Sequence, residues 1–361
     1  MKRTWLGVIF IAAAFIGEAL CAAGAGQDLV SLAGPGNDLA ITPVSGPVDV
    51  SAAKRFLNGI MDGFAVGLNY PWLNYGWDFG DTAWGHRGIS TPESRATVAA
   101  DFARMRSKGA KVVRWFVMSD GRAAPEFDSR GMVTGFDNFF YADMDAALEI
   151  AAANGIKLVL VLFDLKLLDA ANVVNGVQTG GRDGLIRSPE ATRSLFDLAL
   201  IPLFKRYGAS PTILAWEIIN ESEWRISRND VSFSQMYGFA RQVAGLVHTH
   251  TNQMVTLGSA KSTMVAQWKG AGLDFYQYHY YDNMGTLFVP FNIRYSDMGL
   301  DKPCVLGEFS TTSSRSVETH LNTMLNNGFA GAWAWSYRAG DGRSDFNSVA
   351  DRFGAWANAH R

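Results

Sequence analysis

The feature that most constrains the fold of this 361-residue chain is a repeated alternation of short apolar runs with longer helical patterns. Two of the helical patterns have clear start signals, Thr91-Pro92 and Ser188-Pro189, where a capping hydroxyl precedes proline at the first helical position. Others end in a glycine shortly before the next apolar run, where a left-handed cap is expected. These glycines are Gly109, Gly155, Gly208 and Gly328. These helix start and stop signals predict repeated strand-loop-helix units.

Eight apolar runs have the length of strands and are rich in β-branched or aromatic residues. They are Phe64–Asn69, Lys111–Val117, Lys157–Phe163, Ile213–Ile219, Met254–Gly258, Asp274–Tyr280, Pro303–Glu308 and Gly331–Trp335. Several lack polar residues at alternate positions, as expected of parallel strands covered by helices on the outside. The connections from strand to helix are long, at residues 70–90, 119–140 and 164–187, whereas those from helix to strand are short.

This asymmetry predicts an α/β chain that folds as a single (β/α)8 TIM barrel over residues 53–361, with an active site at the C-terminal ends of the strands. A doubly wound open sheet is the structural alternative. A dinucleotide-binding role lacks support, because no Gly-x-Gly-x-x-Gly turn follows the first strand.

The N-terminus has the order of a secretory signal peptide: Lys2 and Arg3, then an apolar run, then small residues. We expect residues 1–25 to be this signal, with cleavage after Ala23 or Ala25, and residues 26–52 to be a linker or lead-in. A retained membrane anchor is the alternative, although the apolar run is short for a bilayer. The protein is therefore expected to be secreted or periplasmic. After cleavage Cys304 is the one remaining cysteine, so no intrachain disulfide is expected.

Charge and composition restrict the partners. The formal net charge is −2, and Lys and Arg are dispersed, so neither nucleic acid nor, after signal removal, a membrane is an expected partner. Aromatic residues make up 12% of the chain and include 11 Trp, whose flat faces suit sugar rings. We expect a carbohydrate substrate. The sequence leaves the oligomeric state open, with a monomer as the default.

Two strands end in a glutamate. The fourth reaches Asn220-Glu221, and the seventh ends in Leu306-Gly307-Glu308. A carboxylate that closes an apolar strand has no packing role there, because burial of an unpaired charge is costly. A buried ion pair with a structural arginine is the alternative for either residue. Two such residues at the same end of a barrel favour catalysis.

These motifs resemble the signatures of the retaining glycosidases built on (β/α)8 barrels, nearest to family 5, the cellulases and mannanases. The resemblance extends over all eight strands. It implies that Glu221 is the acid/base and Glu308 the nucleophile of a double displacement at a β-linked sugar, on a glucan or mannan type of substrate. Transglycosylation on the same scaffold, or a carbohydrate-binding or matrix protein without turnover, are the alternatives.

Other positions match the family less specifically. Arg114 on the second strand is similar to the arginine that orients the nucleophile, and His279 and Tyr281 to a His-x-Tyr pair. Trp335 resembles a sugar-platform tryptophan. Asn220 is expected to bond the sugar 2-hydroxyl. Arg114 as an ordinary ion-pair partner and His279 as a core histidine are the alternatives.

The third strand departs from the family, which commonly has a histidine near its end. Here Asp164 or Lys166 could take that polar position. The first long loop starts after Asn69 and is dense in aromatics, so Asn69 and three tryptophans are candidate sugar contacts; a small core over the barrel mouth is the alternative role for the loop. These tryptophans are Trp72, Trp77 and Trp84. The histidines do not cluster with Cys or Asp, so neither a catalytic metal nor a cofactor is expected. Glu217 is expected to be a buried structural partner and Glu223 a loop residue.

Overall fold

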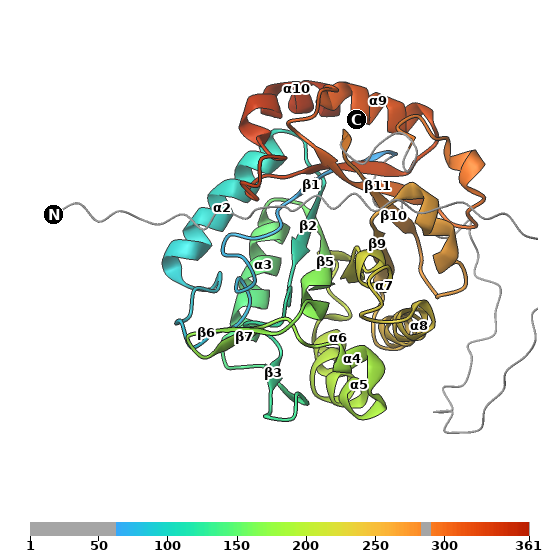
Figure 1. Cartoon of the computed structure of the whole chain (residues 1–361). Coiled ribbons are helices and arrows are strands. Elements are labelled where there is room, and N and C mark those ends of the chain that lie inside the picture. Colours follow the sequence, from blue (N-terminus) through green and yellow to red (C-terminus); the bar gives the residue numbers. More distant parts are fainter. Residues whose placement is uncertain (1–62, 283–289, 361) are drawn as a thin grey trace, which may run out of the picture. The chain divides into compact units, whose positions relative to one another are not determined.

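A computed structural model describes residues 63–282 and 290–360. The expected signal peptide and lead-in lie outside these residues. The described part forms a closed barrel of eight parallel strands in the order β1-β12-β11-β10-β9-β8-β5-β2, with β2 also paired to β1. Helices surround the barrel (Figure 1). The closure confirms the predicted barrel and excludes the doubly wound open sheet.

The eight strands are the eight predicted runs, with ends that differ by at most two residues. They are β1 Ala65–Asn69, β2 Val112–Phe116, β5 Lys157–Asp164, β8 Ile213–Asn220, β9 Met254–Ser259, β10 Tyr276–Tyr280, β11 Cys304–Ser310 and β12 Gly331–Trp335. Short antiparallel hairpins decorate the loops: β3 Glu126–Phe127 with β4 Val133–Gly135, and β6 Asn172–Val174 with β7 Val177–Thr179.

The helices begin and end largely where the local sequence predicts. Thr91 caps α2 and Ser188 caps α5, each accepting a hydrogen bond from a backbone N–H while proline follows. The α-helices are α2 Pro92–Ser107, α3 Phe140–Ala153, α4 Gly184–Arg187, α5 Pro189–Leu195, α6 Ile201–Tyr207, α7 Glu223–Ile226, α8 Phe233–His250, α9 Val317–Asn326 and α10 Phe346–Ala359. Shorter 3-10 segments are Leu165–Leu168, Ser262–Trp268 and Tyr295–Met298, and Phe196–Leu200 is a π-helix. No helix of the described ranges is both long enough and apolar enough for a membrane crossing.

One predicted helix cap is wrong. Gly109, Gly155 and Gly328 have positive φ as expected, but Gly208 has φ −61°. Gly208 instead allows close packing, because a Cβ at this position would lie 2.3 Å from the carbonyl oxygen of His250. A side chain at this position would separate the end of α6 from the end of α8.

Strand alternation separates two apolar regions. On β8, Trp216 packs outward against Phe204 of α6, whereas its neighbour Ala215 faces the barrel interior. The interior residues share one cluster of buried side chains. It contains Ala65, Val112, Val159, Leu214, Ala215, Met254, Phe275, Val305 and Trp333. This cluster lies below the strand ends that carry the polar residues, so it supports them from beneath.

Candidate active site

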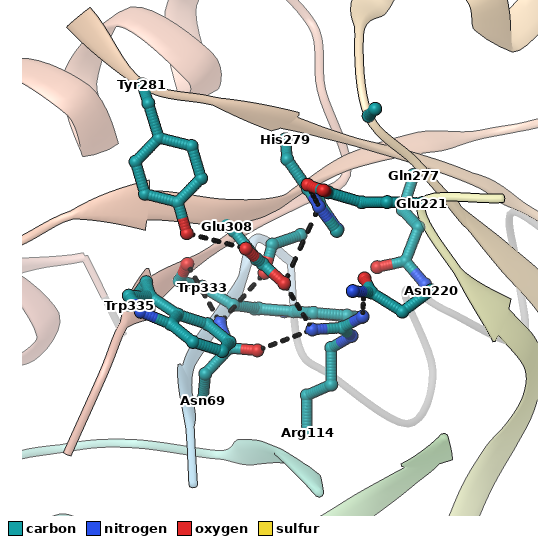
Figure 2. Close-up of polar contacts among 12 residues, drawn as sticks. Asn69, Arg114, Asn220, Glu221, Gln277, His279, Tyr281, Glu308, Trp333 and Trp335 are labelled. Carbon is teal, nitrogen blue, oxygen red and sulfur yellow. Dashed lines mark hydrogen bonds and ion pairs between the residues drawn. The ribbon is translucent and has the colours of Figure 1, made fainter. Parts of the chain in front are cut away.

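Arg114 organises the polar layer at the C-terminal ends of the strands. Its guanidinium is fully buried and donates to both oxygens of Glu217 at 2.6 Å. Nη1 also donates to Glu308 Oε1 at 2.6 Å and to Asn69 Oδ1 at 3.0 Å, and Nη2 donates to Asn220 Oδ1 at 2.8 Å. Figure 2 shows the side chains of Asn69, Asn220 and Glu308 around the guanidinium. One buried cation therefore orients four polar side chains from strands β1, β8 and β11.

A glycine on the neighbouring strand leaves room for the Arg114–Glu217 ion pair. Gly258 of β9 lies beside it, and a Cβ there would come within 2.4 Å of Glu217 Oε1. Gln277 of β10 donates from Nε2 to Glu217 Oε2 at 2.6 Å. The Glu217 carboxylate is thus fully buried, paired and hydrogen-bonded on several sides, which is the condition under which burial of a charge is tolerated.

Glu308 lies on the open side of Arg114 and is 4% exposed. Oε1 accepts from Arg114, and Oε2 accepts from the Tyr281 hydroxyl at 2.6 Å (Figure 2). Burial raises the pKa of the Glu308 carboxyl, while the charge of Arg114 and the Tyr281 hydroxyl oppose that rise. Its two oxygens therefore each hold a donor that favours the ionised form.

Glu221 has different surroundings. Oε2 accepts from Trp224 Nε1 at 2.9 Å, and Oε1 lies 2.6 Å from His279 Nδ1. Burial raises the pKa of the Glu221 carboxyl, and the Trp224 N–H and the charge of Arg114 offset part of this rise. Burial also lowers the pKa of His279, which favours the neutral imidazole. Glu221 therefore lacks the directly bonded cation that Glu308 has, which favours its protonated form.

The backbone aims both carboxyls at one point. Glu221 follows the end of β8 with φ +48°, a left-handed conformation that is uncommon for a residue with a side chain. Glu308 is the register partner of His279, at a shift in the β10–β11 pairing. A carboxylate oxygen of Glu221 and one of Glu308 lie within 4.8 Å of each other. This proximity fits the short spacing of retaining sites, in which the two carboxyl groups lie about 5 to 5.5 Å apart.

The same trio is the one group among the described residues whose spacing suits a metal ion. Glu221, His279 and Glu308 each offer a ligand atom within 4.8 Å of the others. The Arg114 Nη1 donor, 2.6 Å from Glu308 Oε1, already places a permanent positive charge against this cluster. A second cation there would be repelled.

Asn220 and Asp164 are register partners at the ends of β8 and β5. Asn220 Nδ2 donates to Asp164 Oδ1 at 3.1 Å, while its Oδ1 accepts from Arg114. Burial raises the pKa of Asp164 to about 6. The polar position predicted at the end of the third barrel strand, β5, is thus held by Asp164. Lys166 instead pairs with Asp169 at 3.2 Å, and its side chain is half exposed to solvent.

Aromatic rings cover one side of the carboxyl pair. Trp335, Tyr281 and Phe116 share a cluster of buried side chains, and the Trp72 ring lies 6.1 Å from the rings of Phe116 and Trp335. Trp335 Nε1 donates to Asp341 Oδ2 at 2.8 Å, which fixes the ring. The structure thus brings Trp335 into one cluster with Tyr281, which bonds to the predicted nucleophile, and packs Trp72 against Trp335.

Trp77 and Trp84 lie elsewhere in the first loop. Their rings are 5.0 Å apart in an edge contact, and Trp84 Nε1 donates to the Val174 carbonyl of β6. This mutual contact is of the kind expected for a small aromatic core, the alternative role for this loop. Asn69, in contrast, is fully buried and donates from Nδ2 to the Gly307 carbonyl, so it braces the layer from below.

The sequence pattern alone missed several contributors. Trp224 lies three residues after Glu221, a spacing that one helical turn brings together, and that signal could have identified it. Glu223 is not the loop residue that was predicted: it starts α7, is buried, and accepts from Trp268 Nε1 at 3.0 Å. Asp341 follows the last strand in an irregular stretch, where no pattern marks it.

Comparison with known proteins places the chain among carbohydrate-degrading enzymes. No family model matches. The chain is 25% identical over 343 residues to a mannan endo-1,4-β-mannosidase of Cryptopygus antarcticus, covering 82% of this chain and 86% of the relative. It is 28% identical over 319 residues to one of Mytilus edulis, covering 76% and 83%. The crystal structure of an endo-1,4-β-mannanase from Eisenia fetida matches with a TM-score of 0.67 at 24% identity, covering 81% of this chain and 90% of that one.

The barrel, the paired carboxyls and these relatives together define the chain as a glycoside hydrolase. Within that class it is a retaining β-glycosidase similar to family 5, as the motifs at the ends of the fourth and seventh strands predicted.

Proposed function

We propose that this enzyme is an endo-β-1,4-mannanase in which Glu308 is the nucleophile and Glu221 the acid/base. The observation that carries the roles is the pair of carboxyls within 4.8 Å of each other, of which Glu308 alone is bonded directly to a buried arginine. The names of the relatives support mannan as the substrate.

In the first step Glu308 attacks the anomeric carbon and forms a covalent glycosyl ester, while the bond to the leaving oxygen breaks. The proton on Glu221 passes to that oxygen. The Arg114 and Tyr281 donors hold the two Glu308 oxygens at 2.6 Å, so the attacking carboxylate is oriented before the substrate binds.

In the second step Glu221, now ionised, takes a proton from a water molecule that attacks the same carbon. The ester bond breaks and Glu308 leaves as a carboxylate. His279, whose pKa burial lowers, lies 2.6 Å from Glu221 Oε1, and Trp224 holds Oε2. These contacts keep the carboxyl of Glu221 aimed at one point through both steps.

Binding residues surround this pair. Asn220 lies next to the acid/base, and its amide is held between Arg114 and Asp164, in a position to bond the sugar 2-hydroxyl. Trp335 and Trp72 offer aromatic faces to the sugar rings. The buried positions of Arg114 and Asn69 indicate that they act through Glu308 and Asn220 rather than by direct contact.

We further propose that residues 1–25 are a signal peptide, that residues 26–52 are a lead-in to a barrel at residues 53–361, and that the enzyme is secreted or periplasmic. The charged, apolar and small-residue order of the N-terminus supports this. N-terminal sequencing of the exported protein tests it: a mature chain that begins after Ala23 or Ala25 is expected, and a chain that begins at Met1 would contradict it.

A panel of purified polysaccharides tests the substrate. We expect β-1,4-mannan to be cut internally into oligosaccharides, with β-1,4-glucan cut much more slowly. Product analysis at high substrate concentration measures any transfer to a sugar acceptor. A folded enzyme that cleaves glucan and leaves mannan intact would contradict the mannan assignment.

A further inference from the structure

The short helix α7 begins two residues after Glu221 and contacts it through Trp224. The Glu221 backbone N–H donates to the Gly258 carbonyl at 2.7 Å. Trp224 donates from its backbone N–H to the Glu221 carbonyl at 3.2 Å and from Nε1 to Glu221 Oε2 at 2.9 Å. The direction of the Glu221 carboxyl therefore depends on where α7 places Trp224.

The residues on either side of Trp224 are buried and carry opposite charges. Glu223 is 2% exposed and Arg225 is 6% exposed. Among the described residues their ion pairs and hydrogen bonds are made with other parts of the chain and not with each other. Because buried charges are costly unless partners satisfy them, these contacts must explain why both charges are tolerated.

Glu223 binds the segment that follows β9. Its Oε1 accepts from Trp268 Nε1 at 3.0 Å, and its Oε2 accepts from the Ala260 backbone N–H at 3.2 Å. Burial raises the pKa of the Glu223 carboxyl, and the Trp268 N–H opposes that rise. Both oxygens act as acceptors here, which a carboxylate can do and an amide, with its single acceptor atom, cannot. The contact is therefore specific for a carboxylate.

Arg225 binds in the opposite direction. Its Nη1 pairs with Asp169, in the segment that follows β5, and lies 3.5 Å from Asp230 Oδ2. The Asp230 backbone N–H also donates to the Arg225 carbonyl at 3.1 Å. In the barrel β8 lies between β5 and β9. The helix that follows β8 is thus tied to the segments after both neighbouring strands, through Arg225 on one side and Glu223 on the other.

The segment after β9 also holds the Trp224 ring. Lys261 places its ammonium 4.6 Å from the ring centre, a cation–π contact. Lys261 follows Ala260, whose backbone N–H binds Glu223. One short segment therefore fixes both the start of α7 and the indole that α7 presents to Glu221.

These anchors supply what the local chain lacks. A helix of only four residues is marginal on its own, so α7 needs outside contacts to keep its place. Glu221 has φ +48°, a costly conformation that persists only where surrounding contacts fix it. Contacts on both sides of α7 therefore matter most for the residue just before it, which is the acid/base.

We propose that Glu223 and Arg225 form a clamp on α7 that positions the acid/base. The clamp holds the Trp224 indole against Glu221, so that the Glu221 carboxyl faces the leaving oxygen. This inference rests on the proposed function, and both residues act through Glu221. Loosening the clamp should therefore impair proton transfer to the leaving group and spare the attack by Glu308.

Two substrates that differ only in the leaving group separate these steps. A phenyl β-mannobioside needs a proton on the leaving oxygen, whereas a 2,4-dinitrophenyl β-mannobioside releases a stable anion and needs none. The quantity to compare is kcat/KM for release of the aryl group, which covers the steps up to the covalent ester. A general loss of structure lowers it for both substrates alike.

The variants approach the clamp from both sides. Glu223→Gln keeps the size of the side chain but leaves one acceptor atom for two donors. Arg225→Met removes the cation that pairs with the segment after β5, and Arg225→Lys restores it. The matched control is Asp101→Asn, which alters a buried carboxylate of α2 that binds Tyr70 and Arg338. Circular dichroism verifies that each variant is folded.

Glu223→Gln and Arg225→Met should each lose about tenfold in kcat/KM on the phenyl substrate, part of the worth of a general acid, and less than about twofold on the dinitrophenyl one. Arg225→Lys should recover most of that loss. Asp101→Asn should change both substrates by the same factor. Equal losses on the two substrates in the clamp variants, or no loss on either, would overturn the clamp.

Glu221→Gln distinguishes a failure of the clamp from a failure of the proposed function. It should lose about 10²- to 10⁴-fold on the phenyl substrate and little on the dinitrophenyl one. An equal loss on both would reject the acid role of Glu221 itself. A selective loss in Glu221→Gln without one in the Glu223 and Arg225 variants would reject the clamp alone.

Discussion

The interior of the barrel changes from apolar to charged within two residues along β2 and along β8. Val112 on β2 faces an apolar layer and Arg114 a charged one; Ala215 and Glu217 do the same on β8. Both layers are buried, so burial alone does not distinguish them. The lower layer contributes stability through apolar contact, whereas the upper layer keeps charges that only a dense hydrogen-bond network makes tolerable. The upper layer is therefore where chemistry is to be sought.

The largest expected effect is on turnover. Glu308→Gln and Glu221→Gln should each lower kcat on mannan by about 10⁴-fold, because one removes the covalent step and the other the proton transfer. Thermal unfolding should remain cooperative, since neither carboxyl supports the core. Steady-state kinetics together with circular dichroism check this. A folded Glu308→Gln enzyme with near-normal turnover would reject its role.

The next largest effect is on stability. Arg114→Met should lower the free energy of unfolding by about 3 to 5 kcal/mol, because it leaves the Glu217 carboxylate buried without its cation. Urea unfolding measures the loss. A decrease below about 1 kcal/mol would show that the upper layer does not depend on this ion pair in the way its geometry indicates.

A substitution in the lower layer should have the opposite profile. Val159→Ala removes buried methyl groups and should lower the free energy of unfolding by about 2 kcal/mol, while kcat stays unchanged. The same unfolding and kinetic measurements apply. A large fall in kcat without loss of stability would erase the distinction between the two layers.

The smallest effect distinguishes the two carboxyls. The Trp224 N–H stabilises ionised Glu221 and so lowers its pKa, and Trp224→Phe should raise that pKa. Because Glu221 acts in its protonated form, the alkaline limb of the kcat/KM profile should move to higher pH. The acid limb, which reports ionisation of Glu308, should stay in place. Movement of the acid limb alone would contradict the assignment.

Much of this organisation can be predicted from the sequence. Strand ends, helix caps and the two Glu motifs are local signals, and the parallel barrel brings strand ends together wherever they lie in the chain. What local patterns do not give is side-chain direction in loops. Trp72 and Trp77 lie five residues apart with similar neighbours, yet one packs beside Trp335 and the other against Trp84. Glu223 was misjudged for the same reason, because its buried partner Trp268 is 45 residues away.

The stereochemistry of the first product tests the central claim most directly. In the proposed mechanism Glu308 forms a covalent intermediate, and Glu221 then activates a water molecule on the face of the sugar from which the leaving group departed. Proton NMR during early hydrolysis of a six-unit β-1,4-manno-oligosaccharide should therefore show the β-anomer first, with the α-anomer appearing later by mutarotation. Initial release of the α-anomer would mean a single inverting displacement and would contradict the roles assigned to these two carboxyls.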